Sequence, residues 1–295
     1  MTEMIQRVSL EEELVRNPEL KKSHIKLLKE WCKKQPHLPK ILDSELVLFL
    51  SSNYYDLERA KATIEAFYTI RTNTKEYFSS RDPLKNEELR QAFQTSTFMP
   101  LDGETPEGYK IFFGRLINYD PSKFVWAPSM KYLHMSLDLS MFTQGAAKGH
   151  VFIFDMSNAT LGHSTRMSLL GCRKLINYLQ EGLPIRLKGI HFIRSMTIVQ
   201  IVLGMIKPFM KKEITQTVHV HTNDETLEKF VPVDILPNEC GGKAGPLIEI
   251  HQKHIKFLED HRDFFLEEEI NCRVDESLRP RRSSGGALSF FRRSS

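Results

Sequence analysis

Residues 184–210 read "PIRLKGIHFIRSMTIVQIVLGMIKPFM" and join two segments of opposite character. The first segment alternates basic and aliphatic residues, so Arg186 and Lys188 are predicted to project from one face of a strand and Leu187 from the other. Residues 195–206 carry no charge, and their apolar spacing predicts a helix. That helix fits two interpretations: an ordinary buried helix, or a lid that covers a lipid cavity and dips into a membrane when it opens.

The segments around this stretch alternate between predicted strands and helices. Residues 150–157, "HVFIFDMS", form a short apolar run typical of a strand that is buried on both faces. Two further strands are predicted on either side of the turn "DGETPEG" at 102–108, and a long amphipathic helix is predicted over 246–269. This alternation predicts an α/β fold with a mainly parallel sheet.

The two ends of the chain differ from this central part. Residues 9–78 are predicted to be helical, and Ser9 with Glu12 fits a capping box at their start. The stretch "RPRRSSGGALSFFRRSS" at the other end has no acidic residue and cannot bury a core, which predicts disorder. We therefore expect a helical N-terminal domain over 1–80, an α/β domain over 81–271 and a basic Ser/Arg-rich tail over 272–295.

Composition excludes several classes of protein. The 41 Lys and Arg residues barely exceed the 37 Asp and Glu residues, which argues against a nucleic-acid-binding protein. No apolar run is long enough to span a bilayer, and the N-terminal residues lack the apolar core of a secretory signal. The four cysteines are far apart, which argues against a disulfide framework or a zinc ribbon. We expect a cytoplasmic, monomeric protein with reduced thiols.

An α/β sheet raises the question of an enzyme. Asp155 ends the predicted strand "VFIFD", a place where such sheets often carry catalytic groups. However, the sequence has no dinucleotide-binding glycine motif, no phosphate-binding loop and no nucleophile elbow. His219 and His221 share one side of a predicted strand, but no acidic residue or cysteine nearby completes a metal site. We predict no catalysis, no metal and no cofactor.

Five segments taken together resemble the CRAL-TRIO lipid-binding family, and in particular its tocopherol- and retinoid-binding members. They are "VFIFDMSN", "PIRLKGIHFI", "MIKPFM", "VHVHTNDETLEKFVP" and "ILPNECGG". The resemblance implies an N-terminal helical bundle followed by an α/β/α domain whose sheet forms the floor of a closed apolar cavity. It also implies that residues 195–209 form a mobile gate helix, and that Asp155 belongs to a motif without a catalytic role.

The resemblance also implies which residues contact a ligand. They match the family's pocket positions or lie on the strands and the gate that face the cavity, although each residue alone is also typical of an ordinary core. Ser136 would offer its hydroxyl to a polar ligand head. The full set is Leu133, Ser136, Phe152, Phe154, Leu161, Met167, Leu175, Leu179, Leu187, Ile198 and Val202.

Transfer proteins of this family recognise phosphoinositides beside the gate. Arg186 and Lys188 match two of the basic positions, and guanidinium and ammonium groups suit phosphate oxygens. Glu213 and Thr217 stand where two further basic residues are expected, so Lys211 and Lys212 would have to act from shifted positions. The alternative is that Arg186 and Lys188 form a solvated strand face.

These expectations describe an intracellular carrier. It would bind a tocopherol-, retinoid- or other isoprenoid-like lipid and transfer it between membranes, with gate opening assisted by phosphoinositides. Its partners would be the hydrophobic ligand and an anionic membrane surface, with which it associates transiently. The alternative function is a phosphoinositide-binding signalling or scaffold module that transfers no cargo.

Overall fold

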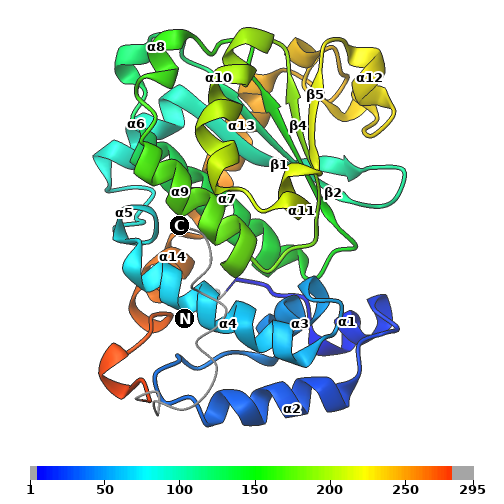
Figure 1. The fold of residues 1–295 in the computed structure, drawn as a ribbon, viewed down its shortest axis with the longest axis vertical. Helices are drawn as coiled ribbons and strands as arrows, with labels where there is room; N and C mark the ends of the chain where they lie inside the picture. Colours follow the sequence, from blue (N-terminus) through cyan, green and yellow to red (C-terminus); the bar gives the residue numbers. More distant parts are fainter. Residues whose placement is uncertain (1–4, 281–295) are drawn as a thin grey trace.

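The computed structural model describes residues 5–280. Its centre is a five-stranded sheet whose strands are neighbours in the order in which they occur in the sequence (Figure 1). β1 and β2 are antiparallel, and the three other pairings are parallel, which confirms the predicted α/β fold with a mainly parallel sheet. The strands are β1 (Ser96–Glu104), β2 (Lys110–Leu116), β3 (His150–Asp155), β4 (Leu187–Ile193) and β5 (Val218–His221).

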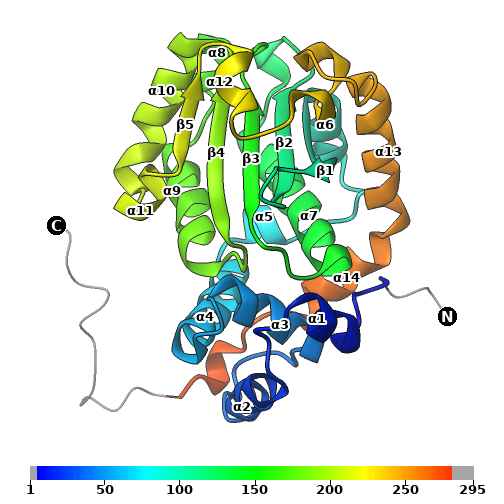
Figure 2. The same ribbon diagram turned by 90° about the vertical axis from the view of Figure 1, so that its right-hand side faces the viewer.

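Each face of the sheet packs against its own layer of helices. Successive side chains of a strand point to opposite faces, so Phe112 and Phe152 join one apolar core while Phe113 and Ile153 join the other. The first core also contains side chains of α7, α9 and α10, and the second contains side chains from α12 and the start of α13. Figures 1 and 2 show these helices around the sheet. These helices are α7 (Trp126–Gln144), α9 (Leu169–Asn177), α10 (Met196–Ile206), α12 (Asp224–Glu228) and α13 (Leu247–Asp260).

Five helices precede α6 (Glu87–Thr95), which leads directly into β1, and the first four of them lie below the sheet in Figure 2. The predicted capping box is present: the Ser9 hydroxyl accepts from the Glu12 backbone N–H, and the Glu12 carboxylate accepts from the Ser9 N–H. Asp56 caps a later helix by accepting from two backbone N–H groups. The helices are α1 (Leu10–Arg16), α2 (Lys22–Lys33), α3 (Asp43–Ser52), α4 (Leu57–Asn73) and α5 (Lys75–Phe78).

The long helix predicted over 246–269 is two helices that meet at His261. The His261 ring nitrogen lies 2.8 Å from the backbone carbonyl oxygen of Phe257, a local bond of the kind that competes with the helical pattern. Within residues 5–280, no helix has both the length and the hydrophobicity needed to cross a bilayer. The remaining helices are α6 (Glu87–Thr95), α8 (Leu161–Ser164), α11 (Lys212–Thr215) and α14 (Arg262–Asn271), with short helical turns at Pro121–Lys123, Tyr178–Gly182, Lys207–Phe209, Val233–Ile235, Asn238–Cys240 and Glu276–Leu278.

The beginning of the predicted disordered tail is bound to the N-terminal helices. The backbone N–H of Val274 donates to the Thr72 hydroxyl at 2.9 Å, and Arg279 forms an ion pair with Glu65 at 3.0 Å. Residues 272–280 therefore differ from the prediction, because backbone and charged groups find partners on α4. The rest of the predicted tail, residues 281–295, lies outside the described residues.

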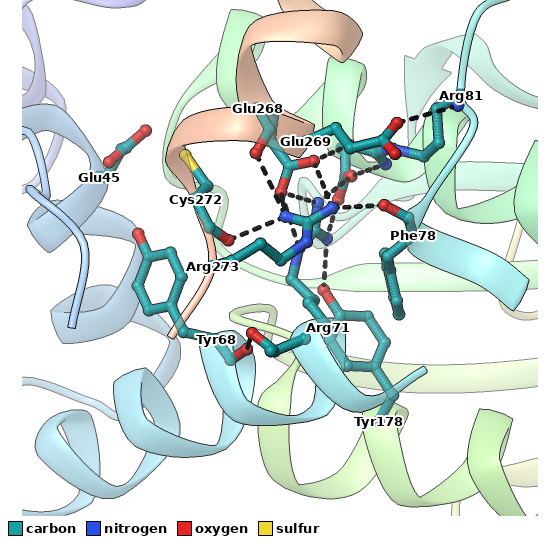
Figure 3. A network of polar contacts seen from close by, with 12 residues as sticks. Glu45, Tyr68, Arg71, Phe78, Arg81, Tyr178, Glu268, Glu269, Cys272 and Arg273 are labelled. Atoms are coloured by element: carbon teal, nitrogen blue, oxygen red, sulfur yellow. Dashed lines mark hydrogen bonds and ion pairs between the residues drawn. The ribbon is translucent and has the colours of Figure 1, made fainter. Parts of the chain in front are cut away.

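A buried network of charges joins α4, α7 and α14 (Figure 3). Both Nη atoms of Arg71 contact the Asp138 carboxylate, at 2.9 and 2.7 Å, and Nη2 also contacts Glu268 at 2.7 Å. Arg81 contacts the same two carboxylates, and Arg273 bonds Glu268 at 2.7 Å. Burial alone would raise the pKa of Glu268, but the neighbouring guanidinium groups hold that pKa well below its ordinary range. The network thus fixes the N-terminal helices against a helix of the α/β layer.

Candidate lipid-binding site

A cavity of about 200 Å³ lies between one face of the sheet and helices α7, α9 and α10. Its walls are almost entirely aliphatic and aromatic side chains. The sheet contributes Phe98, Phe152, Phe154, Ile190 and Phe192; α7 contributes Trp126, Met130, Leu133 and Leu137; α10 contributes Ile198, Val202 and Ile206. Such a wall suits an apolar ligand, because neither the wall nor the ligand gives up strongly bound water when the ligand enters.

Helix α10 closes one side of this cavity. Val199, Val202 and Ile206 are buried on its inner side, whereas Thr197 and Gln200 are exposed. Helix α10 is therefore only weakly amphipathic, because its outward-facing residues are small or uncharged. Both faces could lie in an apolar environment at low cost, which is the property that a gate at a membrane requires.

The chain enters α10 through a strained turn. Arg194 and Ser195 have φ values of +62° and +43°, in the left-handed region that favours glycine. The Arg194 guanidinium holds this turn by donating to the Cys240 carbonyl oxygen at 3.1 Å and to Asp155 at 3.3 Å. The start of α10 is thus tied to the carboxyl ends of the strands.

The structure places most of the sequence-predicted ligand residues together in the cavity wall. The strand residues come from β3, and the others come from α7, α9, α10, the loop before α9 and the helical turn Tyr178–Gly182. Those that line the cavity are Leu133, Phe152, Phe154, Met167, Leu175, Leu179, Ile198 and Val202. Their contact with a ligand remains a proposal.

Three of the predicted ligand residues lie elsewhere. Ser136 is fully buried, and its hydroxyl lies 2.8 Å from His254 Nε2 on α13, so it points away from the cavity. Leu161 is 60% exposed on α8. Leu187 packs half-buried at the beginning of β4, outside the cavity wall. The Ser136 hydroxyl, which was expected to bind the polar head of a ligand, is therefore already hydrogen-bonded within the protein.

Several wall residues were not predicted from the sequence. Met130 lies three residues before Leu133 on α7, and Leu137 lies four residues after it. This spacing places all three on one face of a helix, so it could have identified Met130 and Leu137 from the sequence. Phe98 lies on β1, where alternation along the strand places it on the cavity face. His163 also lines the cavity, and no pattern in the sequence distinguishes it from a surface histidine.

Asp155 has a structural role. Its carboxylate accepts from Arg115 at 2.7 Å and from the Cys240 thiol at 3.1 Å, on the face of the sheet opposite the cavity. Burial, followed by the nearby Asp155 charge, raises the pKa of Cys240 to about 12, so the thiol is neutral and a poor nucleophile. The residue that suggested an enzyme thus ties β2, β3 and the Cys240 turn together.

The histidines of β5 do not form a metal site. The ring of His191 stacks on those of His219 and His221, with centroid separations of 4.8 and 5.1 Å, and His191 Nδ1 lies 2.8 Å from His221 Nε2. Across residues 5–280, no group of three metal-ligating side chains has the arrangement needed to hold an ion.

The predicted phosphoinositide residues fall into two groups. Arg186 Nε donates to the Ser51 carbonyl oxygen at 2.6 Å, and Lys188 Nζ donates to the Tyr54 hydroxyl at 3.0 Å. The Arg186 guanidinium also lies 4.3 Å from the centre of the Tyr54 ring, so Tyr54 brings both cations together. Lys211 instead pairs with Glu181, and Lys212 is exposed at the beginning of α11.

A second hollow, of about 540 Å³, lies between the N-terminal segment and α14. It is larger than the apolar cavity, but charged residues such as Glu45, Asp263 and Glu267 line it. An apolar ligand there would strip water from carboxylates without offering them partners. The smaller, apolar cavity is therefore the better lipid site.

Acid pH is expected to destabilise the fold through buried histidines. Burial lowers the pKa of His134 and of His150 to about 4, and that of His254 to about 3. Unfolded histidines bind protons below about pH 6.5, whereas these folded ones do so only near pH 4, so the unfolded state gains protons first. The stabilisation that depends on these neutral histidines is therefore fully present above about pH 6.5. Below that pH the free energy of unfolding falls by about 1.4 kcal/mol per pH unit for each such histidine.

Urea unfolding at pH 7 and pH 5 measures this loss. His134→Phe keeps an aromatic ring between Tyr77 and Tyr178. This variant should make the free energy of unfolding less dependent on pH, by about the contribution of one histidine. A wild-type protein with equal stability at the two pH values would contradict the prediction.

Comparison with known families and structures agrees with this architecture. The "CRAL/TRIO domain" family matches residues 94–242, about half of the chain, and the family "Pinta-like, UBA domain" matches residues 17–88. Alpha-tocopherol transfer protein-like from Mus musculus is 27% identical over 240 residues, which are 80% of this chain and 69% of that protein. Clavesin-2 from Rattus norvegicus is 24% identical over 209 residues, which are 69% of this chain and 63% of that protein.

Among solved structures, "Crystal structure of Sfh5" superposes with a TM-score of 0.52 at 16% identity. The match covers 85% of this chain and 98% of that one, and it supports the fold alone. The family match, the order of the strands and the apolar cavity together establish that the chain belongs to the CRAL/TRIO domain family of lipid-binding transfer proteins, and not to a family of enzymes.

Proposed function

We propose that this protein is a cytoplasmic carrier that encloses one hydrophobic small molecule and moves it between membranes. The apolar cavity between the sheet and α10 is the observation that supports this proposal. A tocopherol-, retinoid- or other isoprenoid-like lipid fits its chemistry, because the wall is built from aromatic and aliphatic side chains.

The physical benefit of such a carrier is large. Each CH₂ group that leaves an apolar environment for water costs about 0.8 kcal/mol, so a lipid with about 15–20 apolar carbons meets a barrier of roughly 10–15 kcal/mol. A protein that replaces the membrane interior with apolar walls removes most of this barrier. Regulated opening of the wall then becomes the step that limits transfer.

Native mass spectrometry and lipid extraction of the purified protein test the carrier proposal. We expect one apolar molecule per chain, or uptake of one from donor vesicles. A cavity that is empty after purification and takes up no lipid from vesicles would contradict the proposal.

One end of the gate carries an exposed apolar surface that would suit a membrane. Leu161, Leu169 and Leu170 are 60, 57 and 62% exposed on α8 and α9, both of which pack against α10. Residues 156–180 contain no acidic residue, while Arg166 and Arg173 are exposed among these leucines. Exposed apolar side chains flanked by cations favour the interface of an anionic membrane.

Anionic headgroups would act at Arg186 and Lys188. Replacing both with alanine is expected to slow transfer to phosphoinositide-containing vesicles about thirtyfold, because each cation near an anionic surface contributes about 1 kcal/mol and the two together about 2 kcal/mol. Transfer to neutral vesicles should change by less than about twofold, since no phosphate is lost there.

The matched control is Lys33→Ala with Lys34→Ala, which removes two exposed cations at the end of α2. Thermal unfolding of both double variants shows whether the loss of the Arg186–Ser51 bond disturbs the fold. An equal slowing of transfer to both kinds of vesicle would exclude a headgroup role.

The second candidate function is a phosphoinositide-binding signalling or scaffold module. The pairing of Arg186 and Lys188 on Tyr54 favours it, because the two cations are already held together at the surface. Binding to phosphoinositide vesicles without transfer of any lipid between vesicles would favour this function over the carrier.

A further inference from the structure

The cavity contains one polar side chain whose bonding is incomplete. His163 lies on α8, is only 4% exposed and lines the cavity. One edge of its ring faces the start of its own helix, where Nδ1 lies 3.2 Å from the Thr160 backbone nitrogen and 2.9 Å from the Thr160 hydroxyl. The other ring nitrogen, Nε2, is buried and has no hydrogen-bond partner among residues 5–280.

The contacts of His163 determine where its proton lies. A backbone N–H can only donate, so Nδ1 must accept from Thr160 and carries no hydrogen. Burial, followed by the Arg166 charge, lowers the pKa of His163, so the ring is neutral at physiological pH. A neutral imidazole without a proton on Nδ1 has its proton on Nε2. His163 therefore presents an unsatisfied N–H donor.

Two other polar side chains of the cavity wall, those of Tyr178 and Trp126, already have partners. The Tyr178 hydroxyl accepts from Arg71 at 3.0 Å, and the Trp126 indole donates to the Tyr77 hydroxyl at 2.9 Å. Arg115 Nε also lacks a partner among the described residues, but the Arg115 side chain leaves β2 on the opposite face of the sheet, where it meets Asp155.

We propose that the Nε2–H of His163 binds an acceptor oxygen at the polar end of the cargo, an inference that rests on the proposed carrier function. The cargo is then an apolar molecule with a carbonyl, hydroxyl or ether oxygen at one end. A pure hydrocarbon would leave the buried donor unsatisfied, which is unfavourable. The same N–H thus selects among lipids that the apolar walls alone accept equally.

The position of His163 also orients the cargo. α8 lies beyond the carboxyl ends of the parallel strands, since it follows β3 closely along the chain. Leu183 and Met210 line the cavity and precede β4 and β5, on the side of the amino ends of these strands. An oxygen held by His163 therefore directs the apolar tail along the sheet toward Leu183 and Met210.

Three isoprenoids with the same chain test this inference: farnesal, farnesol and the hydrocarbon farnesene. His163→Leu is expected to weaken the binding of the aldehyde and the alcohol about tenfold and to change that of farnesene by less than about twofold. Comparing variant with wild type for each ligand cancels the different solubilities of the ligands in water. His163→Gln, which retains an N–H donor, should recover part of the loss.

The outcomes separate the two proposals. If none of the three ligands binds to the wild type, the carrier function itself is contradicted for this class of cargo. If all three bind and His163→Leu affects them equally, the carrier stands and the role of His163 is overturned, with a bound water left as the partner of Nε2.

Nuclear magnetic resonance of the ¹⁵N-labelled wild type gives a second measurement that needs no variant. We expect the Nε2–H tautomer of His163, and we expect farnesal to shift this signal and slow its exchange with water while farnesene does not. A proton on Nδ1, or identical responses to the two ligands, would overturn the proposal even if His163→Leu fails to fold.

Discussion

Replacing Arg71 with methionine is expected to lower the free energy of unfolding by about 3–5 kcal/mol. Arg71 is fully buried and contacts both Asp138 and Glu268, which are themselves buried (Figure 3). Methionine would fill much of the space but would leave these carboxylates with fewer cations in an environment of low polarity. The cost comes mainly from the charge that remains buried without compensation.

Urea denaturation of the variant and the wild type measures this change. Arg71→Lys should lie between them, because lysine keeps the charge but cannot contact Asp138 with two nitrogens at once. The matched control is Lys33→Ala, which breaks an exposed ion pair with Glu30 and should cost less than about 1 kcal/mol. If Arg71→Met proved as stable as the control, the network would contribute no more than ordinary apolar packing.

Replacing Leu133 with tryptophan is expected to reduce lipid uptake by about two orders of magnitude. Leu133 projects from α7 into a cavity of about 200 Å³, so the larger indole would occupy space that the ligand needs. Excluding three or four CH₂ groups from burial costs about 2.4–3.2 kcal/mol, which corresponds to roughly a hundredfold in affinity. Overpacking should cost the fold only about 1–3 kcal/mol.

Displacement of a fluorescent fatty acid or isoprenoid from the purified protein measures this effect. Leu161→Trp is the matched control, because it makes the same substitution at a position that is 60% exposed and outside the cavity wall. Unchanged uptake by Leu133→Trp, with a folded protein, would show that the ligand binds elsewhere. An equal loss at Leu161 would instead favour the sequence-based assignment of that residue.

Local patterns predicted the elements that build the site. The uncharged run at 195–206 became α10, and the alternating, aromatic run at 150–155 became β3, whose Phe152 and Phe154 line the cavity. Periodicity is a property of neighbouring residues and is therefore visible in the sequence. Alternation along β3 placed Phe152 and Phe154 on the cavity face, but the same reasoning included Leu187 of β4, which lies outside the cavity wall, and did not identify Phe192.

Helix α7 shows where this reasoning stops. Most of its residues from Trp126 to Phe142 are buried, so its sequence has no polar face that marks the opposite one as inner. Leu133 faces the cavity, whereas Ser136 faces His254 on α13, and the two could not be told apart by pattern. A helix that is buried on every side needs its neighbours to define its faces.

Sequence patterns alone were enough to predict the fold class, the basic strand next to an uncharged helix, and the family. Which polar groups are hydrogen-bonded depends on packing: Ser136 has a partner 118 residues away, Arg71 has one 197 residues away, and His163 Nε2 has none among the described residues. The difference arises from the range over which the interactions act. Propensity and periodicity act between neighbours in the chain, whereas a buried polar group depends on partners that only packing brings within about 3 Å.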